Sequence, residues 1–133
     1  MAVVVADQRD MLDRILRDNG LRPDNLELVP DVQAWCRKHQ IEERNPNRQA
    51  KCFLKNDGSC HIVMLDRLTD DLIAGGKGGM LLGGFMSEVT KLDTDIKYLA
   101  HLMLHEVACH VLRTTEQEPR DIWAFERVGR YAI

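Results

Sequence analysis

The chain has 133 residues, of which 44% are hydrophobic and 29% charged, with a formal net charge of -3 at pH 7. This composition excludes a disordered chain and predicts a single domain over residues 1–133. The slightly acidic balance argues against a nucleic-acid partner, and no apolar run reaches the ~18 residues that cross a bilayer, so we expect no membrane partner.

The first expected elements are two helices. Residues 7–19 carry apolar side chains on one helical face and stop at Gly20, which predicts an amphipathic helix. Residues 31–40 predict a second, short helix that begins after Pro30 and buries Val32 and Trp35. A polar loop with a proline follows over residues 42–48. The N-terminus has no basic segment of the secretory type, so we expect a cytoplasmic protein.

The next stretch changes to the pattern of a β-hairpin. Residues 52–55 and 60–65 flank an Asn-Asp-Gly turn, and the second segment is rich in β-branched and apolar side chains. Residues 66–74 fit either a short helix or irregular structure. The glycine-rich residues 75–84 have few side chains to pack, so we expect a surface loop or a flexible flap beside a cleft.

The four cysteines form no Cys-x-x-Cys pair, which favours free thiols: Cys36, Cys52, Cys60 and Cys109. Cys52, Cys60 and His61 are the candidate ligands of an alternative, structural zinc site. Side chains alternate between the two faces of a strand, however, and this alternation favours thiols that are buried in the core.

The C-terminal third predicts two helices. One begins at Asp93 or Thr94 and runs to about Arg113, and the other begins near Pro119 and runs through Arg130. The first is apolar on most sides, which predicts a central position. Helices combined with a hairpin predict an α+β fold.

That central helix carries five side chains able to bind metals or protons within ten residues: His101, His105, Glu106, Cys109 and His110. Burying so many titratable groups is costly unless they are paired or ligate a metal. Zinc peptidases with a His-Glu-x-x-His helix place two imidazoles four residues apart, on one face. Here the second histidine comes five residues after the first, which turns it about 140° away on an ideal helix.

Three arrangements would restore a metal site. Cys109 has the correct spacing from His105 and would replace the second histidine. A one-residue π-bulge would turn His110 toward His105. The pair His101 and His105, four residues apart, would serve instead. A helix without any metal is the fourth possibility.

Residues 104–112 and 116–126 resemble the active-site helix and the following acidic segment of small cytoplasmic zinc peptidases of the ImmA/IrrE type. The resemblance implies a minimal zincin-like fold, with one zinc per chain and Glu106 as the general base for a zinc-activated water that attacks a peptide bond. It also implies a third, acidic ligand, for which Glu118 and Asp121 are the candidates. Cys109 departs from the family pattern, as do Pro119 and Arg120.

We therefore predict a metal-dependent peptidase acting on a peptide or protein substrate. The zinc ligands would be His105, either Cys109 or His110, and either Glu118 or Asp121. The first alternative is a non-catalytic binding or regulatory protein that retains the fold. A second is a non-peptidase metal protein that uses the pair His101 and His105.

Overall fold

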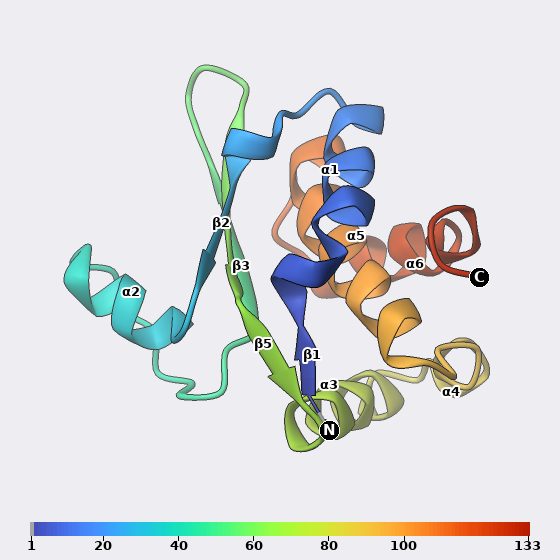
Figure 1. Cartoon of the computed structure of the whole chain (residues 1–133). Helices are drawn as coiled ribbons and strands as arrows, with labels where there is room; N and C mark the ends of the chain where they lie inside the picture. The colour runs from blue at the N-terminus through green and yellow to red at the C-terminus, as the bar shows by residue number, and fades with distance from the viewer. Residues whose placement is uncertain (1) are drawn as a thin grey trace.

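Helices and two small sheets make up the chain, which confirms the predicted α+β class (Figure 1). The computed structural model describes residues 2–133. The strands are β1 (Ala2–Val4), β2 (Leu26–Val29), β3 (Ala50–Leu54), β4 (Cys60–Leu65) and β5 (Arg67–Thr69). The helices are α1 (Arg9–Asp18), α2 (Val32–Lys38), α3 (Asp70–Leu82), α4 (Met86–Val89), α5 (Asp95–Leu112) and α6 (Gln117–Phe125). Short 3₁₀ turns are η1 (Val5–Gln8), η2 (Pro23–Asn25) and η3 (Val128–Arg130).

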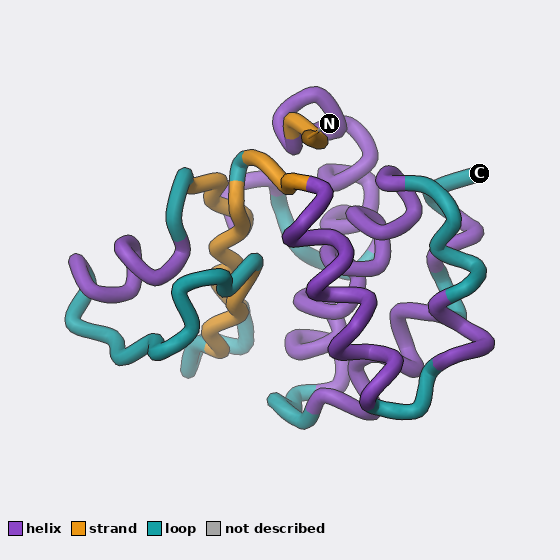
Figure 2. Tube along the Cα trace, turned by 90° about the horizontal axis from the view of Figure 1, so that it is seen from below, coloured by secondary structure: helices purple, strands orange, loops and turns teal. Residues whose placement is uncertain are grey.

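The larger sheet has the order β2-β4-β3 and lies between two helical layers. β4 pairs with β3 in antiparallel fashion, with Cys52 opposite Ile62, so the predicted hairpin is confirmed. β4 also pairs in parallel with β2, and β1 pairs with β5 in a separate two-stranded sheet. Figure 2 shows α2 on one side of the sheet and the other helices on the opposite side. β3 is therefore an edge strand of this sheet.

The central buried helix predicted for the C-terminal third is α5. The Thr94 side chain caps it by accepting a hydrogen bond from the Lys97 amide, and Arg113 ends it in the left-handed conformation. Its apolar side chains are fully buried at Leu99, Met103, Leu104, Val107 and Ala108. The last helix is shorter than predicted, because α6 stops at Phe125 and η3 follows. Among residues 2–133, no helix has the length and apolar character that a membrane crossing requires.

The expectation of a loop or flap over residues 75–84 is wrong, because α3 extends through most of these glycines. The Thr69 side chain caps α3 by accepting a hydrogen bond from the Leu72 amide. Gly76 explains part of the glycine content, since a Cβ atom there would lie 1.9 Å from the Tyr98 hydroxyl. The missing side chain thus lets α3 approach α5 closely. Tyr98 is buried and donates a hydrogen bond to Gln49.

Gly76→Ala is therefore expected to lower the free energy of unfolding by roughly 1–3 kcal/mol, because the buried Tyr98 ring must move to make space. Gly75→Ala is the matched control. A Cβ atom at position 75 meets nothing within 4 Å, so alanine should stabilise the helix by about 0.5–1 kcal/mol. Urea unfolding of both variants measures the difference. Equal effects of the two substitutions would contradict the close approach of Tyr98.

Candidate metal centre

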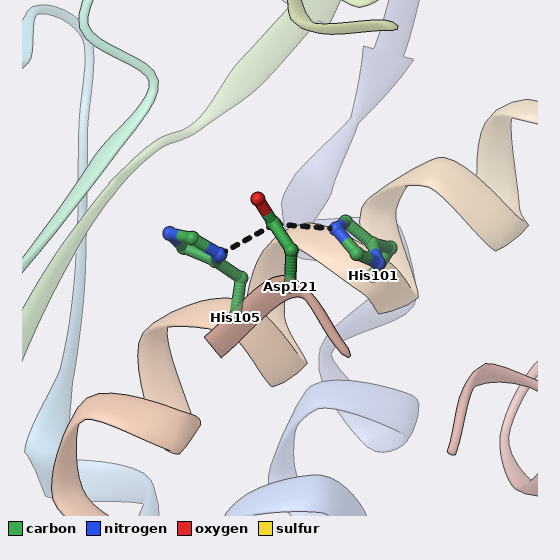
Figure 3. Close-up of side chains that lie close together, drawn as sticks. All are labelled: His101, His105 and Asp121. Carbon is green, nitrogen blue, oxygen red and sulfur yellow. Dashed lines mark hydrogen bonds and ion pairs between the residues drawn. The ribbon is translucent and has the colours of Figure 1, made fainter. Parts of the chain in front are cut away.

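His101 and His105 lie on one face of α5 because they are four residues, or about 40°, apart on the helix. Asp121 reaches both imidazoles from α6, which packs against α5 (Figure 3). Asp121 Oδ1 lies 2.7 Å from His105 Nδ1 and 3.1 Å from His101 Nε2. One carboxylate oxygen therefore accepts hydrogen bonds from two histidines.

The three side chains are close enough to share one ion. One ligand atom from each lies within 4.8 Å of the other two, and within residues 2–133 this is the one group of three such ligands. His101 is 3% exposed, whereas His105 and Asp121 are partly exposed. The group therefore has a buried end at His101 and an open end at His105.

The surroundings favour a neutral imidazole and an ionised carboxylate. Burial lowers the pKa of His101, although the hydrogen bond to Asp121 acts in the opposite direction. Burial raises the pKa of Asp121, but hydrogen bonds from His101 and His105 outweigh it and hold this pKa well below its usual range. These are the protonation states in which both side chains can bind a metal. The His101 Nδ1 atom is buried with no hydrogen-bond partner, and the Phe125 ring packs 4.1 Å from the His101 ring.

Glu106 lies beside this group and is 4% exposed. Its Oε1 atom accepts a hydrogen bond from Arg120 Nη2 at 3.1 Å, and its Oε2 atom lies 3.9 Å from His105 Nε2. Arg120 is itself 5% exposed and also donates to the backbone carbonyls of His105 and Thr115. The guanidinium thus fixes one oxygen of Glu106 and leaves the other directed toward His105.

A cleft of about 700 Å³ opens over these side chains. Its walls come from α3, α5, α6 and the segment of residues 45–50 that leads into β3. The polar lining residues are Asn45, Asn47, Arg48, Gln49, Asp71, Tyr98, His101, His105, Glu106, Gln117, Glu118 and Asp121. The open end of the group, at His105 and Asp121, is therefore accessible to a molecule that enters the cleft.

The other predicted ligands lie outside the three-ligand group. Cys109 is fully buried, and Glu118 lines the cleft. α5 is α-helical from Asp95 to Leu112, without the π-bulge that would turn His110 toward His105. Of the three arrangements considered, the structure brings together the pair His101 and His105. Metal binding at any of these residues stays a prediction.

Sequence reasoning did not find the role of Arg120, which it treated only as a departure from a family pattern. A buried glutamate on an apolar helix requires a cationic or hydrogen-bonding partner. That requirement pointed to a nearby arginine such as Arg120. Gln49 and Tyr98 were also missed as cleft residues, because their proximity depends on how β3 packs against α5.

No family model, curated protein or solved structure matches this chain. The resemblance to zinc peptidases of the ImmA/IrrE type therefore depends on the two quoted segments alone and stays a prediction.

Proposed function

We propose that this protein is a metal-dependent peptidase, with a zinc ion held by His101, His105 and Asp121. The observation that carries the proposal is the proximity of these three ligands to one another at an open cleft, with Glu106 Oε2 3.9 Å from the Nε2 atom of one of them, His105. The proposal retains the predicted reaction but replaces Cys109 or His110 with His101 in the ligand set.

The donor set suits a catalytic zinc ion. Two imidazoles and one carboxylate leave a fourth coordination position for water or substrate. When bound, the ion lowers the pKa of a coordinated water and polarises a carbonyl oxygen. Asp121 would exchange its hydrogen bonds to His101 and His105 for a bond to the metal. The lowered pKa of its carboxyl group keeps it ionised for that purpose.

Glu106 would act as the general base. Its Oε2 atom faces His105, and Arg120 holds the other oxygen in place. A carboxylate fixed in this way presents one free oxygen that can accept a proton. In this proposal Arg120 is a positioning residue, since it acts on the reaction only through Glu106.

The edge strand β3 is where a peptide substrate would bind. β3 pairs with β4 on one side only, and Gln49 and Ala50 at its start line the cleft. An extended peptide can add to such an edge through main-chain hydrogen bonds. This position would bring its backbone near Glu106.

Glu106→Gln tests the proposal, because glutamine matches the size of glutamate but cannot accept a proton. We expect the variant to retain zinc and its fold while cleavage of a peptide library falls by at least ~100-fold. Glu118→Gln is the matched control, since Glu118 also lines the cleft but lies outside the three-ligand group, and it should keep its activity. Equal activity of wild type and Glu106→Gln would overturn the assignment of the base.

The ion pair between Glu106 and Arg120 favours one alternative, a non-catalytic binding protein that retains the fold. The pairing with a buried guanidinium accounts for a glutamate inside the apolar α5 without any catalytic role. This alternative predicts zinc binding without cleavage of any peptide, and a Glu106→Gln variant that behaves as wild type in a peptide-binding assay.

A further inference from the structure

A second cavity, of about 460 Å³, lies between the end of α1 and the residues that follow α6. Among residues 2–133, it shares no lining residue with the cleft over the candidate metal centre. Its lining residues are Arg14, Asp18, Asn19, Arg127, Arg130 and Tyr131. The cavity is therefore a separate candidate binding site.

The lining of this cavity is positively charged, although the chain as a whole is negative. Three arginines and one aspartate give the lining a formal charge of +2, against -3 for the whole chain. Glu126 Oε1 lies 3.8 Å from Arg127 Nη1, but the Glu126 side chain is 65% exposed, so solvent weakens this pair. Positive charge concentrated in a concave site attracts anions.

The single carboxylate of the lining is bound by a tyrosine and not by an arginine. Tyr131 donates a hydrogen bond from its hydroxyl group to Asp18 Oδ2 at 2.8 Å. Burial and this contact raise the pKa of Tyr131 to about 12, so the hydroxyl group stays protonated at neutral pH. Within residues 2–133, no ion pair joins Asp18 to any of the three arginines. A carboxylate of the lining therefore does not occupy the arginine N–H groups.

Contacts with the backbone position two of the guanidinium groups and leave hydrogen-bond donors free. Arg14 Nη2 donates to the backbone carbonyls of Arg130 and Tyr131, both at 3.3 Å. Arg127 Nη1 donates to the Trp123 carbonyl at 3.0 Å, and the guanidinium carbon lies 4.3 Å from the centre of the Trp123 ring. In the described part of the chain, Arg14 and Arg127 thus each use one nitrogen as a donor, and the Arg130 side chain has no hydrogen bond or ion pair. Several N–H groups remain for a ligand.

We propose that this cavity binds the phosphate group of a small molecule. A guanidinium group is a planar fork of N–H donors that matches the spacing of phosphate oxygens. A phosphate dianion would also balance the formal charge of the lining. A nucleic acid would instead require a basic surface that continues along its backbone, and the net charge of -3 argues against such a surface.

The bound phosphate would connect two segments that are far apart in the sequence. Arg14 lies in α1, and Arg130 lies 116 residues later, in η3. A ligand that binds only the folded chain raises the stability of that chain. Phosphate should therefore raise the midpoint of thermal unfolding, without a metal ion and without catalysis.

The experiment is a titration of the metal-free chain with inorganic phosphate and, separately, with glycerol 3-phosphate at constant ionic strength. NMR follows the backbone and arginine N–H signals, and thermal unfolding is measured with and without each probe. We expect saturable shifts at the lining residues and a higher unfolding midpoint. Saturation at a lower concentration of glycerol 3-phosphate would identify a phosphate ester as the ligand class, and the reverse order would identify the free ion.

Arg130→Gln is expected to weaken phosphate binding by about tenfold or more, because it removes charge-assisted hydrogen bonds. The variant should fold as the wild type does, since the Arg130 side chain is exposed. Arg17→Gln is the matched control. It removes the same charge from an exposed position of α1 outside the cavity, so the affinity should stay the same.

Equal losses in Arg130→Gln and Arg17→Gln would overturn the proposal, because binding would then depend on net charge alone. Succinate that binds as tightly as phosphate would also overturn it, since the site would then not select a phosphate group. Shifts centred on His105, or the absence of saturation by either probe, would show that the cavity is not a phosphate site. The protein is free of metal throughout, so these outcomes do not depend on the proposed peptidase activity.

Discussion

His105→Ala is expected to weaken zinc binding by about a hundredfold or more, because it removes the ligand at the open end of the metal centre. His101→Ala and Asp121→Asn should have losses of similar size, since these residues offer the other two ligand atoms. Isothermal titration of metal-free protein with zinc, supported by elemental analysis of the stoichiometry, measures the effect. We expect one zinc per chain in the wild type.

His110→Ala is the matched control for these variants. It removes a histidine from the same helix, but one outside the three-ligand group, so zinc affinity should change little. Loss of binding in His110→Ala or in Cys109→Ala, with His101→Ala unaffected, would show that the ligand set is wrong. Absence of zinc uptake by the wild type would refute the proposed peptidase as a whole.

Zinc affinity should also fall toward acid pH. Protons compete with the metal for the imidazole nitrogens. Burial lowers the pKa of His101, so this residue stays neutral to a lower pH than an exposed histidine. The contribution of His101 to this decline should therefore begin at a lower pH than protonation of an exposed histidine would cause, and zinc titrations at a series of pH values measure it.

The parts of the fold predicted correctly are those with a strong local pattern. α5 was identified from its continuous apolar surface between Thr94 and Arg113, and the β3–β4 hairpin from a turn sequence between two apolar runs. The strand β2 was missed, because four residues that pair in parallel with β4 acquire their role only from a distant segment.

The glycines of α3 show how tertiary packing overrides local propensity. Glycine disfavours a helix by about 1 kcal/mol per residue relative to alanine, so the sequence alone predicted a loop. At Gly76 the absence of a side chain makes room for Tyr98. The sequence alone does not reveal this contact, because it depends on how α3 packs against α5.

The candidate site was predicted in its residues but not in their grouping. The sequence analysis named all three members of the group. It preferred His105 with Cys109 or His110, however, because these pairs come closer to the His-Glu-x-x-His pattern. Helix geometry alone favours His101 and His105, since residues four apart share a face. Asp121 could be placed no more closely than its segment, because its position depends on the angle between α5 and α6.

Arg120→Met is expected to lower the free energy of unfolding by about 3–5 kcal/mol, the cost of leaving a buried charge without its partner. Arg120 supplies the guanidinium that pairs with Glu106 and two further hydrogen bonds to backbone carbonyls. Glu106→Met in the same chain should recover a large part of this loss, because it removes the unpaired carboxylate. Arg44→Met is the control, since Arg44 and Glu42 are 89% and 73% exposed and contribute little as a pair.

Urea unfolding of the two single variants and the double variant gives the coupling energy between Glu106 and Arg120 directly. Additive effects would show that the two charges do not interact and that Arg120 acts only through its backbone contacts. Strong coupling would instead identify the ion pair as the reason that a glutamate can lie in the apolar α5. Glu106 would then be stabilised by Arg120 at the position where the proposed reaction requires a base, so that stability and function would depend on the same contact.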